Sequence, residues 1–115
     1  MDLRALRLAL AAACSLGLLP GALAQPEEVE HGRALYERYC LICHGHEMTG
    51  SPGSAVYDLR RFPKDARERF VLSVTNGKPP AMPSWKGQFS EPQLDHLWAF
   101  VRSGGDPSRP AAGGR

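Results

Sequence analysis

Two cysteines and a histidine stand close together in this chain of 115 residues. Cys40 and Cys43 are separated by two residues, and His44 directly follows the second cysteine. On a helix end, two thiols at this spacing can each add across a vinyl group of one haem, and the adjacent imidazole is then held against the iron. The motif therefore predicts one covalently attached haem, with Cys40 and Cys43 as the attachment points and His44 as an iron ligand.

A redox dithiol and half of a zinc site are the alternatives for two cysteines at this spacing. A dithiol oxidoreductase does not require a histidine after the second cysteine, and its motif normally lies in a βαβ unit. Zinc would need further ligands, and beyond His44 the chain offers only His31, His46 and His96 as histidines. Both alternatives are therefore weaker than haem attachment.

Three helices are expected to position the motif. Residues 27–39 carry apolar side chains at helical spacing, residues 64–75 do so again before Asn76-Gly77, and Ser90 is a suitable N-cap for a last helix that stops at Gly104-Gly105. The intervening residues 45–63 are rich in Gly, Ser and Pro, and no strand pattern is visible. The sequence predicts an all-α domain with three main helices and long loops around one haem.

The two ends of the chain differ in composition from this domain. Residues 1–24 combine Arg4 and Arg7, an apolar stretch and an Ala-Leu-Ala cleavage pattern, as secretory signal peptides do. The apolar stretch is shorter than the roughly 20 residues that span a bilayer. We expect a cleaved signal peptide over residues 1–24, a domain over residues 25–105 and a disordered tail over residues 106–115.

The charge balance excludes one class of function. The formal net charge of +2 would fall to +1 on loss of residues 1–24, and two haem propionates would bring it to about −1. A nearly neutral chain lacks the basic surface that nucleic-acid binding requires. We expect no nucleic acid as a partner, and no stable membrane insertion after signal cleavage.

The sequence resembles the class I cytochrome c family over most of residues 27–103. The matching residues are Gly32 and Tyr36, the run from Cys40 to Gly45, Pro52, Asn76-Gly77, Met82-Pro83, and Leu97 with Phe100. The resemblance implies the cytochrome c fold, in which the first and last helices cross with Gly32 against the side that carries Leu97 and Phe100.

The resemblance also implies Met82 as the second axial ligand. A residue on the other face of the iron must come from a segment distant from His44, and Met82 stands in the proline-rich run of residues 78–84. Met48 is too close to His44 to reach that face. His46 and His96 remain the alternatives, and a thioether would raise the reduction potential relative to a second imidazole.

Three further residues are candidates for the haem environment. By its position in the family pattern, Pro52 is expected to accept a hydrogen bond from the imidazole of His44 and so to orient the ligand. Tyr57 and Trp85 are expected to hydrogen-bond or shield a propionate, although plain packing explains them equally well.

With both axial positions filled by protein, the iron would have no open site for a substrate. We therefore expect a periplasmic electron carrier that docks briefly with redox partners. The runs at residues 58–63 and 74–78 resemble small cytochromes that accept electrons from quinoprotein alcohol dehydrogenases, and a terminal oxidase would be the acceptor. The alternatives are a shuttle between a quinol-oxidising bc-type complex and an oxidase, a haem enzyme or gas sensor, and a haem subunit of a larger oxidoreductase.

Overall fold

The computed structural model describes residues 26–50 and 53–106. The expected signal peptide, the expected tail beyond residue 106 and Pro52 lie outside the described residues. The elements follow one another as α1 (Pro26–Tyr39), α2 (Leu41–His44), the 3₁₀ turn η1 (Leu59–Arg61), α3 (Arg67–Asn76) and α4 (Glu91–Arg102). Within the described residues, extended pairing is limited to one bridge between Lys78 and Met82. The expectation of an all-α domain with three main helices is confirmed.

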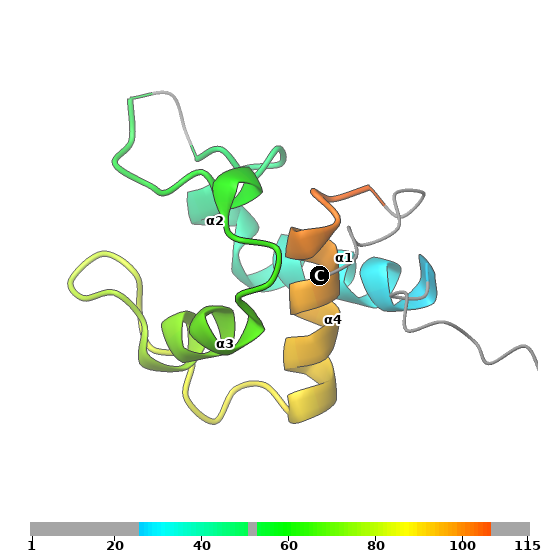
Figure 1. Cartoon of the computed structure of the whole chain (residues 1–115). Helices are drawn as coiled ribbons and strands as arrows, with labels where there is room; N and C mark the ends of the chain where they lie inside the picture. The colour runs from blue at the N-terminus through cyan, green and yellow to red at the C-terminus, as the bar shows by residue number, and fades with distance from the viewer. Residues whose placement is uncertain (1–25, 51–52, 107–115) are drawn as a thin grey trace, which may run out of the picture.

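Helices α1 and α4 cross near the centre of the molecule, while α3 lies beside α4 (Figure 1). The crossing is close because Gly32 has no side chain: a Cβ at this position would overlap the carbonyl oxygen of His96 and lie 2.8 Å from the Cβ of Phe100. Leu97 and Phe100 are both buried at this crossing. The predicted packing of the first helix on the last is therefore confirmed.

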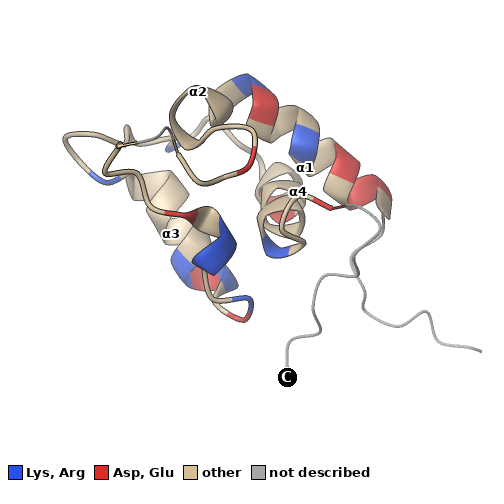
Figure 2. Ribbon diagram, turned by 90° about the horizontal axis from the view of Figure 1, so that it is seen from above, with Lys and Arg blue, Asp and Glu red and all other residues tan. Residues whose placement is uncertain are grey.

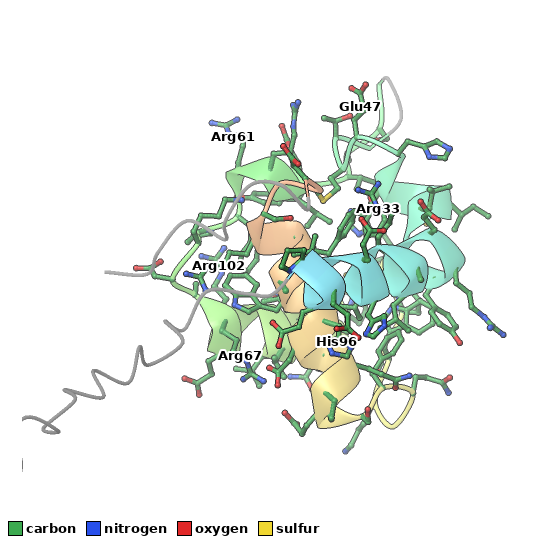
Figure 3. All side chains as sticks on the ribbon, turned by 90° about the vertical axis from the view of Figure 1, so that its right-hand side faces the viewer. Arg33, Glu47, Arg61, Arg67, His96 and Arg102 are labelled. Carbon is green, nitrogen blue, oxygen red and sulfur yellow. The ribbon has the colours of Figure 1, made fainter. Side chains whose placement is uncertain are left out.

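Helix α4 begins and ends as its sequence predicts. The Ser90 hydroxyl accepts a hydrogen bond from the backbone of Gln93, whose side chain accepts one from the backbone of Ser90, so both form a capping box. At the other end, Arg33 of α1 donates to the carbonyl of Gly105 at 2.9 Å, and Figure 3 shows Arg33 on the face of α1 turned to this end. These contacts fix both ends of the central helix.

Helix α3 is shorter at its start than expected, because it begins at Arg67 and not at Lys64. The backbone of Ala66 is non-helical, and its N–H donates to the carbonyl of Pro63 in a turn. Phe70 and Val74 of α3 are buried, and Phe70 packs against Trp98 of α4 with ring centroids 5.3 Å apart. Charged residues lie along α1 and α3 and also occur on α4 and in the loops (Figure 2).

None of the helices in the described part of the chain is long and apolar enough to cross a membrane.

Candidate haem site

The thiols and the imidazole lie on one short helical turn that continues α1. The backbone N–H of Cys40 donates to Tyr36 at 2.8 Å, and that of His44 donates to Cys40 at 2.9 Å. Cys40 is half-buried, Cys43 is exposed, and both are free thiols. Because residues three apart on a helix share a face, the turn presents both sulfur atoms to the same side, as attachment of one haem requires.

The Cys40 thiol is held in its neutral form. Burial, and secondarily the neighbouring Cys43, raises the pKa of Cys40 to about 11. Within residues 26–50 and 53–106, no three His, Cys, Asp or Glu side chains gather where they could hold a metal ion.

One ring nitrogen of His44 is buried without a partner. Its Nδ1 atom has no hydrogen-bond partner among the described residues. Burial also lowers the pKa of His44, which keeps the ring neutral, as a metal ligand must be. The buried Nδ1 therefore lacks an acceptor among the described residues, and the assignment of His44 as an iron ligand stays a prediction.

Tyr36 fixes the turn that follows His44, a role that the sequence did not reveal. Its side chain is 1% exposed, and its hydroxyl donates to the carbonyl of Gly45 at 2.6 Å. Gly45 has a φ of 76°, which favours glycine. The carbonyl of His44 also accepts a hydrogen bond from Gly50 at 2.7 Å. The helical stripe predicted burial of Tyr36, but its acceptor depends on a turn that only the folded chain forms.

The loop that carries Met82 is fixed to the end of α3. Lys78 and Met82 exchange two backbone hydrogen bonds of 2.9 and 3.0 Å. The backbone of Trp85 donates to Val74 at 3.1 Å, and the Ser84 hydroxyl donates to the carbonyl of Thr75 at 2.6 Å. The Met82 side chain is half-buried against the core. The segment is therefore an ordered loop, as its prolines predicted.

The rival ligands lie in different surroundings. Met48 is 1% exposed in the core, and its methyl group lies near Gly105 at the end of α4. His96 packs against His31 at the α1–α4 crossing, with ring centroids 5.0 Å apart, and Figure 3 shows it under α1. His46 is exposed. These placements favour Met82 over Met48 and His96, and the ligand assignment stays a prediction.

Tyr57 and Trp85 have contacts that explain them by packing. The Tyr57 hydroxyl donates to the carbonyl of Arg61 at 3.2 Å, and its ring stands edge-on to Phe62. Trp85 packs against Tyr39 and Phe89. Their suggested role at a propionate stays a prediction.

Two apolar side chains stand exposed beside these segments. Ile42, between the two cysteines, is 88% exposed, and Leu72 on α3 is 53% exposed. Leu72 lines a shallow pocket of about 420 Å³ together with Gly77 and Lys78, at the start of the Met82 loop. Exposed apolar side chains of this kind mark surfaces that a cofactor or a partner protein can cover.

Comparison with known proteins identifies the family. Residues 27–101 match the family model described as cytochrome C oxidase, cbb3-type, subunit III. Quinohemoprotein alcohol dehydrogenase ADH IIB of Pseudomonas putida is 34% identical over 82 residues, which are 70% of this chain but only 12% of that enzyme. Cytochrome c6 of Synechocystis is 29% identical over 84 residues, which are 70% of this chain and 69% of cytochrome c6.

A solved structure shows the same fold. The crystal structure of cytochrome CL from the methylotrophic bacterium Methylophaga aminisulfidivorans superposes with a TM-score of 0.56 and 25% sequence identity, covering 70% of this chain and 57% of that one. The prediction of one covalently attached haem c is thereby confirmed. The chain belongs to the family of the cbb3-type cytochrome c oxidase subunit III, and it is a class I c-type cytochrome that carries one covalent haem c and transfers electrons.

Proposed function

We propose that this cytochrome is a periplasmic single-electron carrier whose haem is attached through Cys40 and Cys43 and whose iron is bound by His44 and Met82. The observation that carries the proposal is that two separate segments hold the candidate residues. One helical turn carries both thiols and the imidazole, and a loop fixed by its own hydrogen bonds carries Met82. When bound, the haem supplies an iron that gains or loses one electron.

The protein groups favour electron transfer over catalysis. Burial keeps His44 neutral, and the Tyr36–Gly45 hydrogen bond fixes the turn beside it. The hydrogen bonds of the Met82 loop hold the thioether in place. If His44 and Met82 both bound the iron, oxygen or peroxide would find no vacant position there, and the two side chains would not need to move when an electron is transferred.

The partner we propose is a periplasmic quinoprotein alcohol dehydrogenase as donor, with a terminal oxidase as acceptor. The 34% identity to part of a quinohemoprotein alcohol dehydrogenase supports the donor. The 27% identity to the cbb3-type cytochrome c oxidase subunit CcoP of Azospirillum supports the acceptor. The signal-like pattern of residues 1–24 supports the periplasmic location.

A second candidate is a permanent haem subunit of a larger oxidoreductase. The chain spans 12% and 10% of the two curated quinohemoprotein alcohol dehydrogenases that it matches, so in those proteins the cytochrome is one part of an enzyme. Gel filtration of the protein from periplasmic extract separates the two candidates. A carrier should elute alone, and a subunit should elute with its enzyme.

Exposed apolar residues of the attachment turn and of the Met82 loop support short-lived docking. Helix α2 carries no Lys, Arg, Asp or Glu (Figure 2). Ile42 is 88% exposed on it, and Pro79, Pro80 and Ala81 are exposed in the loop of Met82. Weak electron-transfer encounters use small interfaces of this kind. Ile42→Asp should slow reduction by the dehydrogenase and leave the visible spectrum unchanged.

The ligand assignment is tested with a pair of matched variants. Met82→Leu and Met48→Leu both keep side-chain volume, and the weak long-wavelength charge-transfer band of the ferric protein reports thioether ligation. We expect Met82→Leu to abolish the band and to allow carbon monoxide to bind the ferrous protein, while Met48→Leu changes neither. Rapid binding of carbon monoxide by the wild type would favour a gas sensor or haem enzyme and would refute the carrier.

The attachment residues are tested by extraction. After expression with a cytochrome c maturation system, the wild type should retain its haem through acid-acetone treatment. The double variant Cys40→Ala, Cys43→Ala should lose it. Covalent haem in the double variant would contradict the assignment.

The donor is tested with a purified quinoprotein alcohol dehydrogenase and its alcohol. We expect the ferric cytochrome to be reduced at a rate that supports turnover. Reduction by a quinol-oxidising complex alone would instead identify a respiratory shuttle.

A further inference from the structure

Three aromatic side chains from two segments of the chain meet beside the haem-binding motif. Tyr39 is the last residue of α1 and directly precedes Cys40, Trp85 follows the Met82 loop, and Phe89 precedes the cap of α4. The ring of Tyr39 stands edge-on to Trp85 at 5.7 Å and to Phe89 at 5.2 Å, and Trp85 and Phe89 are 5.8 Å apart. All three are half-buried.

The cluster joins the end of α1 to the loop of Met82, and these two segments must stay together if Met82 is to remain bound to the iron. The backbone hydrogen bonds of the loop run within it or to α3, where Trp85 meets Val74. The aromatic contacts instead reach the end of α1, from which the chain passes directly into Cys40. Movement of Met82 away from the attachment turn would carry Trp85 with it and open these contacts.

We propose that Tyr39, Trp85 and Phe89 form an aromatic clamp that keeps the Met82 loop closed and sets how rarely Met82 leaves the iron. The inference rests on the proposed function, because it takes Met82 as the ligand. These are positioning residues that act through the loop. Each edge-on aromatic pair shifts an equilibrium by roughly 2- to 10-fold, so the loss of two pairs should raise the open population by about 5- to 100-fold.

The decisive variant lies outside the loop. Tyr39→Leu removes both edge contacts of the clamp without altering the loop sequence, whereas Tyr39→Phe keeps the ring and removes only the hydroxyl. Because the guanidinium of Arg38 also lies 5.4 Å from the Tyr39 ring, Arg38→Gln isolates that contact. Val29→Ala is the control for general destabilisation, since Val29 is 1% exposed in the core.

The measurement is the rate at which imidazole binds to the ferric holoprotein. At saturating imidazole, this observed binding rate equals the rate at which Met82 dissociates from the iron. We expect Tyr39→Leu to accelerate binding by about 5- to 100-fold, and Tyr39→Phe, Arg38→Gln and Val29→Ala to bind at close to the wild-type rate. The double variant Tyr39→Leu, Phe89→Leu should bind imidazole faster than the wild type by a factor smaller than the product of the two single-variant factors, because both residues belong to one cluster.

A wild-type rate in Tyr39→Leu would overturn the clamp, as would equal acceleration by Tyr39→Phe or by Val29→Ala. Failure of the ligand assignment is recognised separately. If Met82 is not the ligand, Met82→Leu retains the charge-transfer band of the wild type. If Met82 is the ligand and the clamp is wrong, Met82→Leu loses the band while Tyr39→Leu behaves as the wild type.

Discussion

Replacing Gly32 by alanine should force α1 and α4 apart. A Cβ at this position would overlap the carbonyl oxygen of His96, and it would lie 2.6 Å from the carbonyl carbon of His96 and 2.8 Å from the Cβ of Phe100. These atoms belong to the backbone of α4 or to the root of a side chain, so no flexible group can move aside. The helices must separate by about 1.5 Å or more to restore ordinary contact distances.

The expected loss of stability follows from two opposing effects. Overpacking against rigid atoms should cost about 3 kcal/mol or more, the upper end of such substitutions, because separation also loosens the buried Leu97 and Phe100. Alanine recovers about 1 kcal/mol through its higher helix propensity. The net loss should be about 2 kcal/mol or more, which lowers Tm by roughly 8–16 °C or more in a domain of this size.

Thermal and guanidinium unfolding of the holoprotein measure this loss. Ala34→Gly, at an exposed position of the same helix, calibrates the propensity contribution. Gly87→Ala is a second control, because a Cβ there meets no atom within 4 Å although φ is 78°, so its cost should be only about 1–2 kcal/mol. A Gly32→Ala protein as stable as the wild type would refute the close crossing of the two helices.

Two further variants probe the haem-binding turn and the loop. Tyr36→Phe should lower the free energy of unfolding by about 1–2 kcal/mol, because the carbonyl of Gly45 loses its donor. Burial raises the pKa of Tyr36 far above its ordinary 10.0, so the wild type should also lose stability as pH rises above about 10, where only the unfolded chain releases this proton. Denaturation series at pH 8 and pH 10.5 should show a smaller alkaline loss of stability in the variant. Gly77→Ala should weaken the charge-transfer band and admit carbon monoxide, because φ is 70° and a Cβ would lie 2.6 Å from the carbonyl oxygen of Met82; an unchanged band would show that the loop does not depend on this close approach.

The local pattern of the sequence was sufficient to predict the helices and to recognise the attachment motif. The stripe containing Val29 and Tyr36 is buried in α1, and Ser90 caps α4 as expected. Such features are predictable because helical periodicity and capping depend on residues only three or four positions apart. The start of α3 was placed too early, because Ala66 supplies no side-chain cap and a turn at Pro63 delays the helix.

The sequence by itself determined which cofactor to expect, because Cys40, Cys43 and His44 lie within one helical turn and their spacing is recognised without any distant residue. The tertiary structure decided what surrounds that turn. It placed Met48 in the core, gave the Tyr36 hydroxyl its acceptor, and brought Trp85 against the last residue of α1. These contacts join residues far apart in the chain, so they depend on how helices and loops pack, and periodicity along the sequence carries no record of that packing.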